Sequence, residues 1–305
     1  MNVQIGIKSD PIEYRYGHEW LFKLMERLGV HYLQLGSWFE MYSLPDRYFI
    51  RLRDQAADHG VLIPSCFSAR RELGGFVSPD PDVQAVTRAS YRRLIEIGVL
   101  VGAESVGASI GAIPRDRMDT KQEAIERCMP AMSEMAEYAG QAGLKTITIE
   151  PMSSLAEPPS TPDEITGFME RLNADGEESV SVPVYYCSDV SHGLADESGS
   201  VVHSHMELFE HAIPWMWEFH IKNTDARFES TFGFGPADSQ RGIVDLGVLA
   251  ECIRANADRF PREAIVGYLE IPGPKLGRDY SDGLLEGQLT ESIEAIKGYF
   301  PPDVA

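Results

Sequence analysis

Thr146-Ile147-Thr148-Ile149-Glu150 is a short run of β-branched residues that ends on a carboxylate. β-Branched residues favour strands, and a run of this length is typical of a buried strand. Three later runs also end on a metal-binding side chain: Val184-Tyr185-Tyr186-Cys187-Ser188-Asp189, Trp217-Glu218-Phe219-His220 and Val266-Gly267-Tyr268-Leu269-Glu270. The carboxyl ends of neighbouring parallel strands meet at one edge of the sheet. We therefore expect four side chains to converge there: Glu150, Asp189, His220 and Glu270.

The same alternation of strand and helix runs through the whole chain. Eight strands are predicted at residues 3–8, 31–35, 62–67, 105–109, 146–150, 184–189, 217–221 and 265–271. Eight helices are predicted at residues 19–28, 45–58, 83–101, 121–142, 162–172, 204–211, 246–257 and 283–299. Eight strand–helix units predict an α/β fold, the (β/α)8 TIM barrel, as a single domain over residues 1–305. A doubly wound sheet would normally carry a glycine-rich turn after its first strand, and Ile7-Lys8-Ser9-Asp10-Pro11 contains none.

The composition is that of an ordinary globular protein, with 43% hydrophobic and 24% charged residues. A formal net charge of −20 repels phosphate backbones and anionic lipid, so we expect neither nucleic acid nor membrane as a partner. No apolar run approaches the roughly 20 residues of a membrane span, and no signal peptide is recognisable, which favours a cytoplasmic protein. The four cysteines form no CxxC pair, so we expect reduced thiols, with Cys187 facing the barrel interior.

Three carboxylates and one imidazole suit a divalent cation that tolerates mixed ligands. Mn²⁺, Co²⁺, Mg²⁺ and Zn²⁺ all remain open as the cofactor. One such ion would leave positions for two substrate oxygens, such as those of an α-hydroxy ketone, and would polarise the carbonyl. Glu150 and Glu270 come from strands separated by others, so they would flank the substrate. One glutamate would remove a carbon-bound proton, and the other would return a proton to the opposite face of the enediolate.

Several further side chains near strand ends are predicted to bind the substrate. His192 follows Asp189 closely and would bind a substrate hydroxyl or orient Asp189. Trp38, beyond the second strand, is predicted to form an apolar pocket wall. Four basic side chains lie at or just beyond strand ends: Lys8, Arg70, Lys222 and Arg227. They favour an anionic substrate such as a sugar phosphate or a sugar acid, and ion pairing with nearby acids is the alternative.

These motifs bring a known family into view. Ile149-Glu150-Pro151, Asp189-x-x-His192, His220 and Leu269-Glu270 resemble the xylose-isomerase-like TIM-barrel superfamily of sugar and sugar-phosphate isomerases and epimerases. The resemblance is closest to the ketose 3-epimerases and to the tetrulose-phosphate isomerases and epimerases. It spans the whole chain at the level of the fold, but the specific motifs lie in the second half.

The resemblance implies roles for individual residues. It implies that Glu150, Asp189, His220 and Glu270 bind one divalent metal and that the two glutamates move protons. It also implies that His192 contacts the substrate, that Lys222 or Arg227 does so after the seventh strand, and that Asp245 caps a helix. Members of the superfamily commonly form dimers or tetramers, so a homodimer or homotetramer is expected.

The chain departs from the family pattern at two places. Met152 stands where a polar residue often follows Glu-Pro, and the loop over residues 223–241 is long and aromatic. Substrate identity therefore cannot be transferred from one relative. The expected activity is metal-dependent C3-epimerisation or isomerisation of a ketose or ketose phosphate through a cis-enediolate.

Three other functions compete with this expectation. The first is aldose–ketose isomerisation of a small sugar or sugar acid. The second is a catalytically inactive sugar-binding protein, which the presence of both glutamates disfavours. The third is an AP-endonuclease-type DNA-repair enzyme, which is disfavoured by the negative charge and by the lack of metal ligands at the ends of the third and fourth strands.

Overall fold

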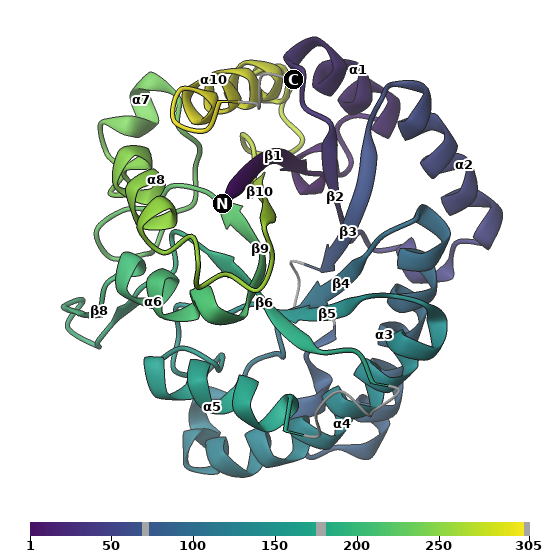
Figure 1. The fold of residues 1–305 in the computed structure, drawn as a ribbon, viewed down its shortest axis with the longest axis vertical. Coiled ribbons are helices and arrows are strands. Elements are labelled where there is room, and N and C mark those ends of the chain that lie inside the picture. The colour runs from purple at the N-terminus through teal and green to yellow at the C-terminus, as the bar shows by residue number, and fades with distance from the viewer. Residues whose placement is uncertain (69–72, 175–180, 302–305) are drawn as a thin grey trace.

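A closed barrel of eight parallel strands forms the centre of the protein (Figure 1). The computed structural model describes residues 1–68, 73–174 and 181–301. The barrel strands are β1 (Asn2–Lys8), β2 (Tyr32–Gly36), β3 (Leu62–Ser68), β4 (Ser105–Ala108), β5 (Thr146–Ile149), β6 (Val184–Asp189), β9 (Met216–Ile221) and β10 (Ala264–Leu269). They follow one another around the barrel in chain order, and β10 closes on β1. The prediction of a TIM barrel is confirmed, and the largest difference at a strand end is in β10, which stops at Leu269 rather than at residue 271.

The helices pack around the outside of the barrel (Figure 1). The long ones are α1 (His18–Leu28), α2 (Asp46–Asp58), α3 (Pro81–Val101), α4 (Lys121–Ala142), α5 (Pro162–Leu172), α6 (His205–Ala212), α8 (Leu246–Ala255) and α10 (Leu285–Lys297). Local chemistry fixes where they begin. At α5, Thr161 accepts a hydrogen bond from the Glu164 amide and Pro162 occupies the first turn. At α8, the Asp245 carboxylate accepts from two backbone amides, so the expected capping role of Asp245 is confirmed.

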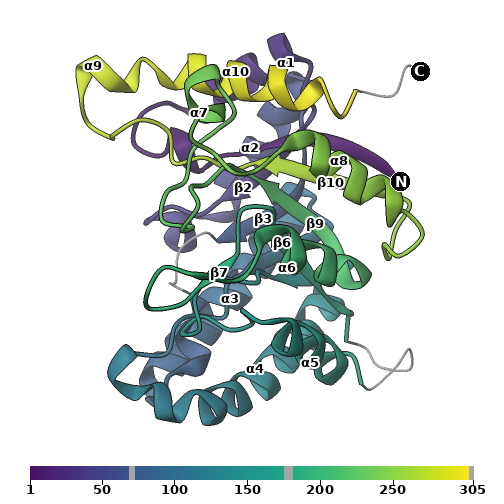
Figure 2. The same cartoon turned by 90° about the vertical axis from the view of Figure 1, so that its left-hand side faces the viewer.

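The structure contains short elements that the sequence did not predict. A two-stranded hairpin, β7 (Leu194–Ala195) and β8 (Val201–His203), occupies the loop after β6. Two helices of one turn, α7 (Pro236–Ser239) and α9 (Asp279–Asp282), occupy the loops after β9 and β10. They are too short to show a hydrophobic period. Figure 2 shows β7 and α9 on the side of the barrel opposite the N-terminus, which is the side where the strands end.

Strand alternation decides which side chains enter the barrel, because successive residues face opposite sides of a sheet. In β9, Phe219 faces outward and packs edge-on against Phe209 of α6, with 5.6 Å between the ring centroids. Glu218 and His220 therefore face the interior, where Cys187 of β6 lies 3.3 Å from His220 Nε2. The expectation for Cys187 is confirmed, and all four cysteines are free thiols. The barrel thus carries polar groups beneath its rim as well as on it.

Within the described ranges, no helix combines the length and apolar character that crossing a bilayer requires.

Candidate metal centre

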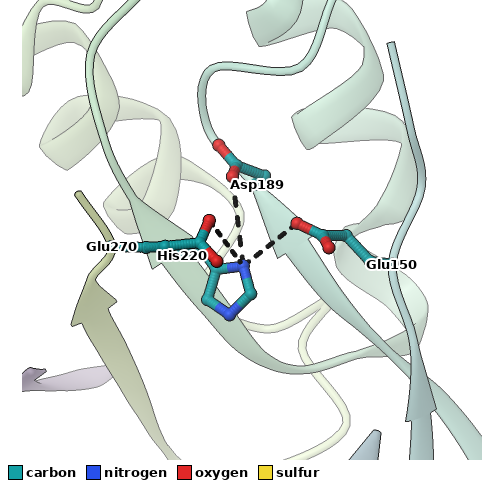
Figure 3. A group of neighbouring side chains, drawn as sticks. All are labelled: Glu150, Asp189, His220 and Glu270. Carbon is teal, nitrogen blue, oxygen red and sulfur yellow. Dashed lines mark hydrogen bonds and ion pairs between the residues drawn. The ribbon is translucent and has the colours of Figure 1, made fainter. Parts of the chain in front are cut away.

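Four side chains meet at the carboxyl end of the barrel, as Figure 3 shows. Glu150 and Glu270 directly follow β5 and β10, Asp189 ends β6, and His220 lies one residue before the end of β9. All four are buried, and one potential ligand atom from each lies within 4.8 Å of the others. His220 Nδ1 is 3.0 Å from Glu150 Oε1, 3.5 Å from Glu270 Oε2 and 3.9 Å from Asp189 Oδ2. The structure therefore brings together the set that the strand ends predicted.

In Asp189, Glu270 and His220, the polar atom that points away from the centre of the cluster is hydrogen-bonded to another protein group. Asp189 Oδ1 accepts hydrogen bonds from the backbone amide and the hydroxyl of Ser191, at 2.7 and 2.8 Å. Glu270 Oε1 accepts from Lys8 Nζ at 2.5 Å. His220 Nε2 donates to Gln34 Oε1 at 2.8 Å. These contacts orient the remaining atoms, Asp189 Oδ2, Glu270 Oε2 and His220 Nδ1, toward one another.

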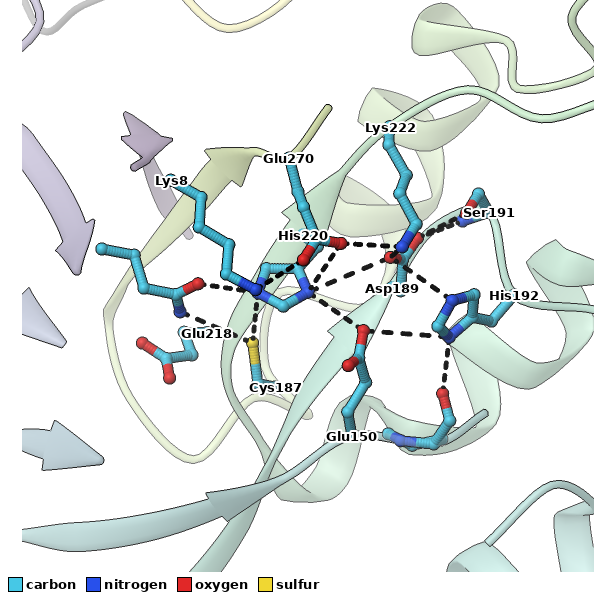
Figure 4. A network of polar contacts seen from close by, with 12 residues as sticks. Lys8, Glu150, Cys187, Asp189, Ser191, His192, Glu218, His220, Lys222 and Glu270 are labelled. Atoms are coloured by element: carbon cyan, nitrogen blue, oxygen red, sulfur yellow. Dashed lines mark hydrogen bonds and ion pairs between the residues drawn. The ribbon is translucent and has the colours of Figure 1, made fainter. Parts of the chain in front are cut away.

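Two buried lysines balance much of the negative charge (Figure 4). Lys222 Nζ lies 2.6 Å from Asp189 Oδ2 and 2.7 Å from Glu270 Oε2. Burial opposes ionisation of Glu270, but His220, Lys222 and Lys8 together hold its pKa well below the usual range. Burial opposes ionisation of Glu150 as well, and attraction and hydrogen bonding from His220 outweigh it, so the pKa of Glu150 is also lowered. Both glutamates are therefore carboxylates at neutral pH, the form that binds a cation.

The donor set fits a divalent metal. Three carboxylate oxygens and one imidazole nitrogen, all buried and aimed at a common point, are the ligands that Mn²⁺, Co²⁺, Mg²⁺ and Zn²⁺ accept in proteins. Buried carboxylates that lie close together repel one another unless a cation lies between them. We therefore regard Glu150, Asp189, His220 and Glu270 as the residues that would hold one ion.

The structure places His192 and Lys222 beside this cluster. His192 Nδ1 donates to the Pro151 carbonyl at 2.7 Å, and its Nε2 lies 3.6 Å from Asp189 Oδ2 (Figure 4). Arg227 is exposed, and its Nε lies beside Gly199 in the loop between β7 and β8. Of the two basic residues that the sequence offered after the seventh barrel strand, Lys222 is the one that contacts the cluster.

The other predicted substrate residues lie in three different settings. Lys8 is fully buried, with its Nζ 2.5 Å from Glu270 and 3.2 Å from Asp10. Trp38 is half-buried and lines a cavity of about 130 Å³. Arg70 lies outside the described residues. Their roles in binding a substrate stay predictions.

A larger cavity reaches the cluster at Glu270. It measures about 390 Å³ and is bordered by Glu270 and Lys222, by Asp10 and Ser37, which follow the neighbouring strands β1 and β2, and by Thr231 from the loop after β9. It shares part of its wall with the cavity of Trp38. A space of this size with several convergent polar groups is typical of a small-ligand site.

The long loop after β9 is folded down onto the protein. Asn223 and Phe232 exchange backbone hydrogen bonds of 2.9 and 3.1 Å, and both Phe232 and Phe234 are buried. The guanidinium of Arg241 lies 3.8 Å from the centre of the Phe232 ring. The aromatic residues that distinguish this loop in the sequence therefore anchor it, and Thr231 is the residue that it contributes to the cavity.

Sequence reasoning missed a group of polar side chains below the cluster. Gln34 contacts His220, and the buried Glu218 accepts hydrogen bonds from Ser65 at 3.0 Å and Thr148 at 3.1 Å. Burial raises the pKa of Glu218, although these hydroxyls and His220 act to lower it. The available signal was the spacing of Glu218 and His220, since residues two apart in a strand share a face.

Comparisons with known proteins agree with this architecture. The sequence profile of the family described as "Xylose isomerase-like TIM barrel" matches residues 22–260. The D-erythrulose 1-phosphate 3-epimerase of Brucella abortus (strain 2308) is 28% identical over 124 residues, which are 40% of this chain and 39% of that protein.

Two solved structures share the fold over almost the whole chain. One is a provisionally assigned xylose isomerase from Rhodospirillum rubrum ATCC 11170, with a TM-score of 0.77, 20% identity and coverage of 97% of this chain and 99% of that one. The other is the D-psicose 3-epimerase of Clostridium cellulolyticum H10, with a TM-score of 0.72, 15% identity and the same coverage. With the profile match over most of its length, the chain belongs to the xylose isomerase-like TIM barrel family.

Proposed function

We propose that this protein is a divalent-metal-dependent epimerase or isomerase that acts on a ketose or a ketose phosphate. The observation that carries the proposal is the meeting of Glu150 and Glu270, from β5 and β10, in one buried cluster with Asp189 and His220 beside a polar cavity. Two carboxylates on either side of a substrate are what proton removal and return at one carbon require. The curated relative named above is an epimerase of a sugar phosphate, which supports the same class.

The metal would be held by the four cluster residues. When bound, it would polarise a substrate carbonyl and stabilise negative charge that develops on the oxygen. Asp189 and His220 would serve only to hold the ion. Mn²⁺, Co²⁺, Mg²⁺ and Zn²⁺ all fit a set of three carboxylates and one imidazole.

Glu150 and Glu270 would move the protons, and their surroundings differ. Two lysines contact Glu270, whereas the contacts of Glu150 within the described part of the chain come from the imidazoles of His220 and His192. Glu150 is therefore the carboxylate that more readily carries a proton between turnovers. Lys222 borders the cavity and would donate a hydrogen bond to a substrate oxygen.

The cavity supports a small polyhydroxy substrate. Ser37, Asp10 and Thr231 present side chains that bind hydroxyl groups, and Glu270 and Lys222 form the reactive side. The cations that line it, Lys222 and Arg15, each contact a carboxylate, as does the adjacent Lys8. These pairs support the alternative explanation of the basic residues, which is ion pairing with nearby acids. Both a neutral ketose and a ketose phosphate therefore remain candidate substrates.

A solvent-exchange experiment tests the class of reaction. The protein is incubated with Mn²⁺ in D₂O with four- to six-carbon ketoses and their phosphates, and deuterium is located by NMR. We expect deuterium at C3 for an epimerase or at C1 for an aldose–ketose isomerase. Incorporation at neither carbon of any of these sugars, by protein that binds Mn²⁺, would support the alternative of an inactive sugar-binding protein.

The DNA-repair alternative gains no support from the site. It would require metal ligands on the second, third and fourth strands, and β2, β3 and β4 end at Gly36, Ser68 and Ala108. Assembly into dimers or tetramers and a cytoplasmic location stay predictions.

A further inference from the structure

A chain of hydrogen bonds runs through the barrel interior and ends on the imidazole of His220. Gln34, on β2, is fully buried. Its Oε1 lies 2.8 Å from His220 Nε2, and its Nε2 lies 3.2 Å from Ser65 Oγ. Ser65 Oγ in turn lies 3.0 Å from Glu218 Oε1. Residues from four strands contribute to this chain: Gln34 from β2, Ser65 from β3, Thr148 from β5, and Glu218 and His220 from β9.

The direction of each hydrogen bond follows from the donors and acceptors available. Glu218 Oε1 receives two hydroxyls, from Ser65 and Thr148, and is the acceptor in both contacts. A serine hydroxyl has one hydrogen, and Ser65 uses it on Glu218. Ser65 Oγ must therefore accept from Gln34, which turns the amide nitrogen of Gln34 toward Ser65 and its carbonyl oxygen toward His220.

The direction of the hydrogen bond between His220 and Gln34 determines which ring nitrogen of His220 keeps a free electron pair. A carbonyl oxygen only accepts, so the hydrogen on the His220 ring is kept at Nε2. The nitrogen that remains for a metal is Nδ1, the atom that lies 3.0 Å from Glu150 and 3.5 Å from Glu270. Ring orientation and the choice of nitrogen are what outer contacts of metal-binding histidines control.

We infer that Gln34, held by Ser65 and Glu218, is a positioning residue that makes His220 Nδ1 the metal-binding atom. The inference rests on the proposed metal centre. It adds Gln34, Ser65 and Glu218, which lie outside the cluster, to the residues that shape this centre. The interior of a TIM barrel is usually packed with branched apolar side chains, and buried polar groups lower stability unless they are hydrogen-bonded. The polar chain therefore has a consequence at the metal centre that apolar packing could not provide.

The test compares metal affinity and the state of the imidazole in matched variants of the full chain. Mn²⁺ affinity is measured by calorimetry without substrate. Gln34→Leu removes the acceptor at nearly constant volume, and we expect Kd to rise by roughly 10- to 100-fold, the usual effect of losing an outer contact of a metal ligand. Gln34→Glu keeps an acceptor and should bind Mn²⁺ at least as tightly as the unmodified protein.

A control and a second route keep the test decisive. Thr148→Val removes a hydroxyl from Glu218 but leaves the path from Ser65 to His220 intact, so its Kd should stay within about a factor of two. Ser65→Ala does not touch His220, yet it frees the Gln34 amide to turn and should weaken Mn²⁺ binding. If Gln34→Leu does not fold, the Mn²⁺ affinities of Ser65→Ala and Thr148→Val are compared instead, and weaker binding in Ser65→Ala alone supports the inference.

The spectroscopic measurement uses ¹⁵N-histidine in the Zn²⁺-loaded protein. We expect a slowly exchanging hydrogen at His220 Nε2, and its exchange should become fast in Gln34→Leu. A merely structural role for Gln34 would lower stability without changing this signal or the ratio of Mn²⁺ affinities. Unchanged affinity and exchange in Gln34→Leu and Ser65→Ala would overturn the inference alone. Failure of the unmodified protein to bind Mn²⁺ would overturn the proposed metal centre and the inference with it.

Discussion

The two halves of the barrel rim carry different chemistry. Strands β1 to β4 end on or next to a serine, and all four are buried: Ser9, Ser37, Ser68 and Ser109. Strands β5, β6, β9 and β10 end on or next to a residue of the charged cluster: Glu150, Asp189, His220 and Glu270. Hydroxyl groups bind polar substrates without competing for a cation. We interpret the acidic half as the part that reacts with a substrate and the serine half as a part that binds it.

Lys8 links the two halves. It lies at the end of β1 in the serine half, but β1 pairs with β10, and Lys8 Nζ reaches Glu270. On the other side, Ser37 borders the same cavity as Glu270 and Lys222. Residues of both halves of the rim therefore border one cavity, and substitutions in each half can test its role separately.

The largest expected effect is on the acidic half. Glu150→Gln and Glu270→Gln keep the shape of the side chain but remove the group that moves a proton, so kcat should fall by about 100- to 10,000-fold. Steady-state kinetics on the substrate found by deuterium exchange measures this. Glu104→Gln is the matched control, since Glu104 precedes β4 at the other end of the barrel and pairs with Lys145. Substantial activity in either cluster variant would break the division into a reactive and a binding half.

The next effect concerns competition between Lys222 and a metal. Lys222 Nζ contacts oxygens of Asp189 and Glu270, so Lys222→Met leaves the cluster more negative by one charge. A charge 4 Å away is worth about 4 kcal/mol at the effective dielectric constant of a protein surface, and about 1.4 kcal/mol is enough for a tenfold change in affinity, so Mn²⁺ should bind at least about tenfold more tightly. Calorimetry checks this, with the exposed Lys275→Met as the control. Weaker Mn²⁺ binding in Lys222→Met would contradict the assignment of these oxygens to the metal.

A smaller effect is expected in the serine half. Ser37→Ala removes one hydroxyl from the cavity wall and should raise KM by about 2- to 10-fold, the value of one hydrogen bond, with little change in kcat. Ser133→Ala is the control, because the Ser133 hydroxyl donates to the carbonyl of Met129 in its own helix α4. A fall in kcat as large as that of the glutamate variants would place Ser37 among the reacting groups and remove the contrast between the halves.

The smallest effect is expected away from the rim chemistry. Asp245 caps α8 through hydrogen bonds of 2.7 and 3.1 Å to the amides of Gly247 and Val248. Asp245→Ala should lower the free energy of unfolding by about 0.5–2 kcal/mol and leave Mn²⁺ affinity unchanged. Chemical denaturation and calorimetry on the same sample separate the two quantities. Loss of metal affinity would show that this acid also contributes to the cluster.

The fold could be predicted from the sequence because each barrel strand and each long helix has its own period of hydrophobic residues. The convergence of Glu150 and Glu270 could be predicted for a related reason, since parallel strands end at one edge. The hairpin of β7 and β8 was missed because two or three residues show no period.

Contacts between distant residues limited what the sequence could say about the site. Gln34 is a single polar residue in an apolar strand, and its partner His220 lies 186 positions away. Lys222 and Arg227 follow the same strand, but the sequence does not determine the path of the loop between them. Only the folded chain shows that Lys222 contacts the cluster and that Arg227 lies beside Gly199.

The measurement that tests the central claim most directly is anomalous diffraction from a crystal of the protein grown with Mn²⁺ and a ketose. We predict one strong peak within bonding distance of Glu150, Asp189, His220 Nδ1 and Glu270, with two oxygens of the sugar on the same ion. A peak bound elsewhere, or one that does not contact both Glu150 and Glu270, would contradict the account.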